Sequence, residues 1–377
     1  MTALDRALSA PKNLTQTELA AFLASEDEGL WCETFAAARE VKTRCGKAEV
    51  LPRGLIECSN VCAKDCLYCG IRKSNAKVPR YRLPEAEAFA CIDEARRRGY
   101  PAVAFQAGEI ESEANAAYYE RLVAYAAGRT RRQECRRPVL GEPGNLPVLG
   151  ELSALEVTLS LGEQTEEVYR RWKAAGAMRY LIRIETSNRE LYAKLHPADC
   201  SFDRRLGCIR TLKRLGYVTG TGVMIGLPGQ TLDDLANDIV FYGEENVDMV
   251  GMGPYIPHEA TPLGAEGISD LGCQGSGSEC LGSGSGGRIL GMRPERADVR
   301  LKLALRMIAL TRLYLHGVNI VAATALEALD PEGGRNRGIE AGANVVMPVL
   351  TPVEHRSSYD LYPGKVRGEG EQWFLQS

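Results

Sequence analysis

The sequence predicts an α/β protein whose main body is a closed (β/α)8 barrel of the TIM type. Apolar runs that suit buried strands alternate with amphipathic runs that suit helices, and this alternation implies a parallel sheet. Eight such strands are expected, which suggests closure into a barrel. The chain has 377 residues, a length that fits one barrel with additions. A doubly wound open sheet is the alternative, but it would need fewer strands.

The expected elements follow from composition and from helix end signals. Residues 15–44 are rich in strong helix formers and predict two helices before the first strand. The helix at 84–98 begins with Pro84 and ends before Gly99, and the helix at 232–245 has Thr231 and Asp234 as a capping pair. The other main helices are expected at 116–127, 166–175, 202–215 and 300–315. The strands are expected at 51–57, 102–106, 157–161, 180–185, 218–225, 249–253, 319–323 and 344–347.

These elements divide the chain into N-terminal helices (1–48), a barrel (49–365) and a tail (366–377). Two surface insertions interrupt the barrel, at about 128–153 and at about 264–297. The second contains the low-complexity run GCQGSGSECLGSGSGG. Its cysteines make a poor metal site, because metal ligands need a rigid frame.

Charge and hydropathy exclude several classes of protein. The net charge is −3, from 46 basic and 49 acidic side chains, which excludes the basic footprint of a nucleic-acid-binding protein. No apolar run reaches the length of a membrane span, and residues 1–11 lack a secretory or transit pattern. We therefore expect a cytoplasmic protein without nucleic-acid or membrane partners. In such a reducing compartment, clustered cysteines more often bind metal or do chemistry than form disulfides.

Three cysteines follow the first expected strand with the spacing C-x3-C-x2-C, at Cys62, Cys66 and Cys69. Three thiolates on one compact loop can hold three irons of a 4Fe–4S cubane, so the fourth iron has no protein ligand. The amine and carboxylate of a methionine group can chelate this open position. An electron from the cluster can then break the sulfonium C–S bond of S-adenosylmethionine (SAM). The spacing therefore predicts one 4Fe–4S cluster and SAM as cofactors.

A zinc site is the alternative explanation for these thiols. Zinc in structural sites takes four ligands, and no histidine lies near this motif in the sequence. Cys58 is the only local candidate for a fourth ligand. It is expected on the first strand and to point elsewhere, so the cluster is favoured.

Other residues at the expected strand ends suit SAM. Gln106, Gly108 and Glu109 end the second strand, where Gly108 admits a close ligand and Glu109 can accept a hydrogen bond from an ammonium. Taken alone, this motif fits an ordinary strand-to-helix turn equally well. The glycine-rich turn at 222–231 suggests a backbone platform for the adenine, although taken alone it is a weak signal.

Charged residues of the fourth expected strand share one face. Arg179, Arg183 and Glu185 have the same parity, and facing the lumen they would form an anion and ribose site. A surface stripe of ion pairs is the alternative, but a strand of a covered barrel has little exposed surface. Arg204 and Arg205 open a helix, where cations oppose the helix dipole, and this misfit indicates a carboxylate partner.

The chain resembles the HydE family of FeFe-hydrogenase maturases, in the radical SAM branch that also holds biotin synthase and methylornithine synthase. The resemblance spans residues 59–365 apart from the two insertions. It rests on the runs SNVCAKDCLYCGIR, TLSLGE, RYLIRIETSN, GYVTGTGVMIGLPGQTLDDL, DMVGMGPYIPH, EAGANVVMP and LYPGK. It implies a radical SAM barrel with the cluster and SAM at its top and an inner cavity below.

The motifs and the resemblance together predict the site residues. The cluster ligands, counted as catalytic, are Cys62, Cys66 and Cys69. The SAM contacts are expected at Tyr68, Gln106, Gly108, Glu109, Ser160, Glu185, Arg205, Gly226 and Leu227. The resemblance implies a substrate cavity lined by Thr158, Arg179, Arg183, Thr324, Met347, Tyr359 and Tyr362. Its arginines suit an anionic or carboxylate-bearing guest.

The resemblance also implies an activity and partners. Family members are thought to convert an iron–carbonyl–cyanide cysteine synthon into a precursor of the hydrogenase diiron subcluster, using a 5′-deoxyadenosyl radical. The implied partners are a reductant such as ferredoxin or flavodoxin and the companion maturases HydG and HydF. Some relatives bind a second cluster through cysteines in the stretch that matches 331–344, where this chain has none, so we expect one cluster. Algal relatives are fused to HydF, and a trimmed half of such a fusion would place the chain in the plastid stroma.

Three alternatives remain open from the sequence. A biotin synthase-like sulfur inserter would need Cys91, Cys135 and Cys200 to converge on a second cluster inside the barrel. A methylornithine synthase-like enzyme shares the fold, although the quoted runs look less like it. A non-catalytic iron–sulfur carrier would not need Glu109, Glu185 or arginines in the lumen.

Overall fold

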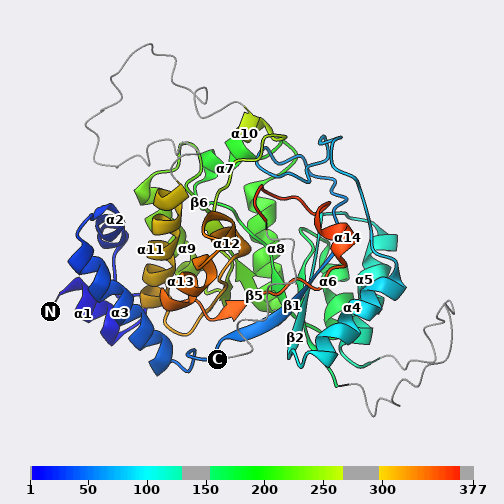
Figure 1. Ribbon diagram of the computed structural model, residues 1–377, viewed down its shortest axis with the longest axis horizontal. Helices are drawn as coiled ribbons and strands as arrows, with labels where there is room; N and C mark the ends of the chain where they lie inside the picture. Colours follow the sequence, from blue (N-terminus) through cyan, green and yellow to red (C-terminus); the bar gives the residue numbers. More distant parts are fainter. Residues whose placement is uncertain (1, 130–152, 266–296, 366–377) are drawn as a thin grey trace.

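The computed structural model describes residues 2–129, 153–265 and 297–365. Within these residues an eight-stranded parallel sheet curls into a barrel with helices around it (Figure 1), which confirms the fold class predicted from the sequence. The described residues leave out most of the two insertions and the tail at 366–377, and with them Cys135, Cys273 and Cys280. The division into domains stays a prediction.

All neighbouring strands of the barrel run parallel, as the alternation of strand and helix predicts. Their order is β10-β1-β2-β3-β4-β5-β7-β9. A parallel bridge between Val321 and Val345 joins the two end strands and completes the ring. The strands are β1 (Leu51–Ser59), β2 (Ala102–Ala107), β3 (Glu156–Ser160), β4 (Ala177–Leu181), β5 (Val218–Thr221), β7 (Met249–Val250), β9 (Asn319–Ile320) and β10 (Val345–Val346).

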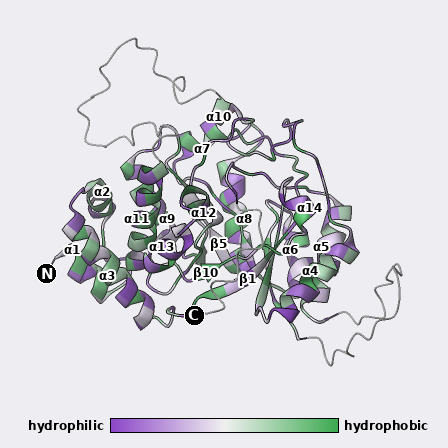
Figure 2. Cartoon of the chain, in the orientation of Figure 1, coloured by the Kyte–Doolittle hydropathy of each residue, from purple (hydrophilic) through white to green (hydrophobic). Residues whose placement is uncertain are grey.

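The helices cover the outside of the barrel, and hydrophobic and hydrophilic residues alternate around them (Figure 2). Three helices rather than two precede β1: α1 (Ala3–Ser9), α2 (Gln16–Ala24) and α3 (Glu28–Arg44). The larger ones after β1 are α4 (Glu85–Arg97), α5 (Glu113–Ala126), α6 (Glu166–Ala175), α8 (Phe202–Arg214), α9 (Leu232–Glu244) and α11 (Ala297–Leu315). Shorter helices are α7 (Arg189–Leu195), α10 (Pro262–Ala265), α12 (Thr324–Leu329), α13 (Gly334–Glu340) and α14 (Val353–Arg356). No helix among the described residues is long and apolar enough to cross a membrane.

Several expected strands end early, and two of the breaks shape the top of the barrel. The strand expected at 218–225 divides into β5 and β6 (Met224–Ile225), and β6 pairs with β8 (Gly253–Pro254) instead of continuing the barrel. The division lies where Gly222 packs against Gly251, so closely that a Cβ on Gly222 would meet the Gly251 carbonyl oxygen at 2.0 Å. The strand expected at 180–185 ends at Leu181, and Glu185 has a φ of +68°. Glu185 therefore leaves the strand and lies on the loop that follows it.

A buried carboxyl group on α9 holds this loop in place. Asp238 Oδ1 accepts hydrogen bonds from the Ser187 backbone nitrogen and hydroxyl, both at 2.6 Å. Asp238 is fully buried, and burial raises the pKa of its carboxyl group to about 7. The loop that carries Glu185 is thus anchored by a group that titrates near neutrality.

Replacing Asp238 should change how stability depends on pH. The ordinary pKa of an aspartate is 3.8, and that of folded Asp238 is about 7. Between these two pH values folded Asp238 keeps a proton that the unfolded chain has lost, so its contribution to stability falls as the pH rises. The Asp238→Asn variant lacks this proton and should lose that part of the slope, at most about 1.4 kcal/mol per pH unit. Urea unfolding between about pH 4 and pH 7 measures both slopes. Equal slopes for variant and wild type would show that Asp238 does not titrate in this range.

Candidate active site

A cavity of about 290 Å³ opens at the top of the barrel, where the carboxyl ends of the strands lie. In a barrel of this kind, functional residues come from the loops at that end. Most of the residues predicted from the sequence line this cavity: Cys62, Cys66, Tyr68, Cys69, Gln106, Gly108, Glu109, Ser160, Arg183, Glu185, Arg205, Thr324, Tyr359 and Tyr362. The structure therefore brings together side chains that lie far apart in the sequence.

The cysteine loop is held in shape mainly by one arginine. The Arg80 guanidinium donates hydrogen bonds to the backbone carbonyls of Asn60 at 2.7 Å, Ile71 at 2.8 Å, Arg72 at 2.6 Å and Asn75 at 3.1 Å. These carbonyls flank the three cysteines on both sides. Arg80 therefore ties together the segments on either side of the cysteines.

The three thiols share a largely buried environment. Burial raises the pKa of the Cys62 thiol and raises that of Cys69 to about 12. Cys62 Sγ also accepts hydrogen bonds from the backbone nitrogens of Lys64 at 3.4 Å and Glu109 at 3.3 Å, which favour the thiolate. A bound metal ion acts in the same direction, because a positive charge stabilises thiolates. The donor set thus suits a thiolate-bound metal cluster.

The candidates for a fourth thiol ligand lie in different places. Cys58 is fully buried, donates a hydrogen bond to the Ile56 carbonyl at 3.5 Å, and has Cys91 of α4 as its main charged neighbour. It does not line the cavity, as predicted. Cys200 hydrogen-bonds to Cys66, a contact that no sequence pattern indicated. Cys91 and Cys200 therefore have different surroundings, which gives no support for a second cluster between them.

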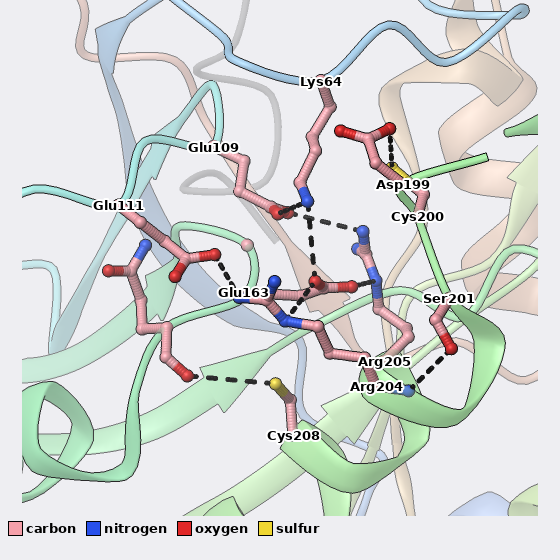
Figure 3. A network of polar contacts seen from close by, with 12 residues as sticks. Lys64, Glu109, Glu111, Glu163, Asp199, Cys200, Ser201, Arg204, Arg205 and Cys208 are labelled. Atoms are coloured by element: carbon pink, nitrogen blue, oxygen red, sulfur yellow. Dashed lines mark hydrogen bonds and ion pairs between the residues drawn. The ribbon is translucent and has the colours of Figure 1, made fainter. Parts of the chain in front are cut away.

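Next to the cysteine loop lies a buried network of ion pairs (Figure 3). Arg205 Nε contacts Glu163 Oε1 at 2.7 Å, and its Nη2 contacts Glu109 Oε2 at 3.4 Å. Lys64 Nζ lies 3.2 Å from Glu109 Oε1 and 3.7 Å from Glu163 Oε2. Burial raises the pKa of Glu109, and Arg205 and Lys64 act against this shift. Two carboxylates and two cations thus balance each other at one side of the cavity.

On another wall of the cavity, Glu185 forms an ion pair with Arg183 at 2.9 Å. Burial raises the pKa of Glu185, and Arg183 lowers it. Arg183 Nη2 also donates to the Val223 carbonyl at 3.0 Å. Among the described residues, Arg183 Nε is buried without a hydrogen-bond partner, whereas Glu185 Oε2 contacts Arg183 Nη2 and Glu109 Oε1 contacts Lys64 Nζ. Buried polar atoms are seldom left unpaired, so Arg183 Nε indicates a polar ligand.

The tyrosine of the cysteine motif is fixed by a histidine. The Tyr68 hydroxyl lies 3.0 Å from His196 Nε2, and His196 Nδ1 lies 2.9 Å from the Tyr192 carbonyl. Burial lowers the pKa of His196 to about 4, so the ring is neutral near pH 7. Its Nδ1 therefore donates to Tyr192, and its Nε2 accepts from Tyr68. No sequence pattern indicates this contact, because it joins residues that lie 128 positions apart in the chain.

Five predicted site residues lie outside the lining of this cavity. The backbone nitrogens of Gly226 and Leu227 both donate to Gln230 Oε1, at 2.7 and 3.1 Å, so they are already paired. Arg179 forms an ion pair with Glu156 at the start of the barrel strands. The other two are Thr158, on β3, and Met347, which packs near β1 and β2. Their assignment to SAM or substrate stays a prediction.

Gly108 offers a direct test of how the cysteine loop is positioned. A Cβ at this position would meet the Val61 carbonyl oxygen at 2.2 Å and Cys62 Cβ at 2.8 Å. Gly108→Ala should therefore displace the loop and reduce the iron bound after anaerobic reconstitution by several-fold, with the fold retained by circular dichroism. Gly207→Ala is the matched control, because a Cβ there meets nothing within 4 Å. Equal iron content in the two variants would contradict this role of Gly108.

Comparisons with known proteins agree with this geometry. The Radical SAM superfamily matches residues 56–241. The [FeFe] hydrogenase maturase subunit HydE of Thermotoga maritima is 39% identical over 355 residues, which cover 94% of this chain and 86% of the relative.

Solved structures show the same fold at low identity. Methylornithine synthase has a TM-score of 0.68 at 22% identity, covering 92% of this chain and 85% of that one. HydG from Carboxydothermus hydrogenoformans has a TM-score of 0.70 at 18% identity, covering 96% and 73%. Both confirm the barrel, whereas the relative from Thermotoga maritima decides the family. The chain belongs to the HydE family of radical SAM proteins.

Proposed function

We propose that the chain is a radical SAM enzyme that cleaves SAM reductively and acts in maturation of the FeFe-hydrogenase H-cluster. The observation that carries this proposal is the common cavity, in which three cysteine thiols face a buried set of carboxylates and cations. A non-catalytic iron–sulfur carrier has no need of such a set. The 39% sequence identity to HydE of Thermotoga maritima supports the maturation role.

The residues present fit both cofactors. Cys62, Cys66 and Cys69 would hold three irons of one 4Fe–4S cluster, which leaves the fourth iron for the methionine group of SAM. Glu109, whose Oε1 contacts Lys64 Nζ at 3.2 Å, can also accept a hydrogen bond from the amino group of SAM. Arg205 suits the SAM carboxylate, because a guanidinium pairs well with a carboxylate.

When bound, the cluster and SAM supply one-electron cleavage of the sulfonium C–S bond and so a 5′-deoxyadenosyl radical. The residues of the chain itself bind and orient the cofactor, and they exclude water from the site. Tyr68, held by His196, gives the site a rigid aromatic wall. Glu185 lies on the cavity wall, where a ribose hydroxyl can donate a hydrogen bond to its carboxylate. Because these groups are buried, water is kept from the reactive carbon.

The substrate side of the cavity carries a positive charge that is only partly neutralised. Arg183 has one carboxylate partner, Glu185, and its Nε has no hydrogen-bond partner among the described residues. Thr324 and Tyr362, which hydrogen-bond to each other, and Tyr359 line the same cavity. This lining supports an anionic, cysteine-derived organometallic substrate. We include a ferredoxin or flavodoxin reductant, and HydG and HydF as companions, in the proposal.

Reconstituted protein tests the first half of this proposal. The wild type should bind about four irons per chain and form 5′-deoxyadenosine when reduced with SAM, because one cubane holds four irons. Alanine at Cys62, Cys66 or Cys69 should remove both properties, whereas Cys32→Ala should not, since Cys32 is exposed on α3. Iron analysis and chromatography of the nucleoside provide the measurement. Wild-type protein that holds zinc and forms no 5′-deoxyadenosine would refute the proposal.

A maturation reaction tests the second half. Apo-hydrogenase incubated with HydG, HydF and the reconstituted chain should gain hydrogen-evolving activity, and it should gain none when the chain is omitted or carries Cys66→Ala. The reaction links the chain to the H-cluster because every other component is held constant. SAM cleavage without any hydrogenase activation would instead favour a biotin synthase-like or methylornithine synthase-like activity.

A further inference from the structure

Glu163 lies at the centre of the ion-pair network, although it does not line the cavity (Figure 3). Its side chain is 0% exposed. Oε1 contacts Arg205 Nε at 2.7 Å, and Oε2 contacts Arg204 Nε at 3.1 Å and Lys64 Nζ at 3.7 Å. Lys64, Arg205 and Glu109 do line the cavity. Glu163 therefore reaches a ligand only through the charged residues that it holds.

The backbone around Glu163 is anchored, so its carboxylate is a fixed point. Gly162 has a φ of +73°, and its carbonyl accepts a hydrogen bond from the Tyr180 hydroxyl at 2.9 Å. On the other side, the Gln164 backbone nitrogen donates to the Tyr169 hydroxyl at 3.0 Å, and Gln164 Nε2 donates to the Ile110 carbonyl at 3.1 Å. These contacts fix the loop after β3 against the loop after β2. When a ligand binds, the long side chains of the cations can adjust while Glu163 stays in place.

The charges of this cluster show what Glu163 contributes. Glu109 and Glu163 carry two negative charges, and Lys64 and Arg205 carry two positive ones. The contact of Arg205 with Glu163 is shorter than its contact with Glu109, 2.7 Å against 3.4 Å. Glu109 already contacts both cations, with Lys64 Nζ at 3.2 Å and Arg205 Nη2 at 3.4 Å. Without the negative charge of Glu163, Glu109 would lose the carboxylate with which it shares these two cations, and both would be drawn closer to it.

We propose that Glu163 is a positioning residue that shares Arg205 and Lys64 with Glu109 and so leaves Glu109 able to accept a hydrogen bond from the amino group of SAM. This inference rests on the proposed function. When that amino group donates to Glu109, Glu163 remains as the carboxylate partner of Lys64 and Arg205. The SAM carboxylate would lie on the side of Arg205, because a guanidinium pairs well with a carboxylate. Glu163 accordingly acts on the amino-acid end of SAM and has no effect on the adenosine end.

The test is the affinity of reconstituted holoenzyme for two probes, SAM and 5′-deoxyadenosine, measured by calorimetry. Glu163→Gln keeps the shape of the side chain and removes its charge. It should weaken SAM binding about tenfold, which is the effect of about 1.4 kcal/mol. Binding of 5′-deoxyadenosine, which lacks the amino-acid group, should stay unchanged. A general distortion of the site would weaken both probes alike and would overturn the inference.

Glu111→Gln is the matched control. Glu111 pairs with Arg204 in the same network, but its side chain is 38% exposed and does not line the cavity. This variant should bind SAM as the wild type does. Equal weakening in Glu111→Gln and Glu163→Gln would overturn the inference, because it would assign the effect to the overall charge of the region. Wild-type affinity in Glu163→Gln would overturn it as well.

A double variant keeps the inference testable if Glu163→Gln loses its cluster. Combining Glu163→Gln with Lys64→Gln restores the charge balance, leaving Glu109 and Arg205 as one pair. Recovery of the cluster and of part of the SAM affinity supports the inference, and no recovery overturns it. The proposed function is judged separately: wild-type holoenzyme that binds no SAM refutes that function whatever the variants do.

Discussion

One buried guanidinium, that of Arg205, joins three loops at the top of the barrel. It contacts Glu109 after β2 and Glu163 after β3, and both carboxylates contact Lys64 in the cysteine loop after β1. Removing one partner of a buried ion pair costs about 3–5 kcal/mol, because a charge is left uncompensated. The relative positions of the cysteines and of the carboxylates are therefore coupled. The cysteine loop and the loops after β2 and β3 therefore form one structural unit.

The sequence predicted the barrel and the cysteine motif because both signals are local. Alternating apolar and amphipathic runs identify strand and helix without knowledge of their partners, and the spacing of Cys62, Cys66 and Cys69 is visible within eight residues. The parity argument placed Arg183 and Glu185 on one face, and both line the cavity, although Glu185 lies beyond the end of β4 and has a positive φ. Tertiary packing decides that conformation, through the hydrogen bond from the Glu185 nitrogen to the Gly222 carbonyl at 3.0 Å.

Contacts between distant segments were beyond the reach of sequence patterns for the same reason. Glu163 ends the run TLSLGE, which supports the resemblance but does not indicate an ion-pair role, and its importance comes from Arg205, 42 residues later. The misfit of cations at the start of α8 did indicate a carboxylate partner, which the structure identifies as Glu163. His196 and Cys200 gave no signal at all, since each acts on the cysteine motif from the region between β4 and α8.

The two ends of the cavity differ in charge, and this difference orders the chemistry. Beside the cysteines, Glu109 and Glu163 balance Lys64 and Arg205, so this region is suited to a zwitterion. At the other end Arg183 shares one carboxylate and keeps an unpaired Nε among the described residues, so this region is suited to an anion. Arg183 and Arg205 both lower the pKa of Glu185, so this carboxylate is the electrostatic link between the two groups of charges. The charge of Glu185 therefore acts both beside the cysteines and at Arg183.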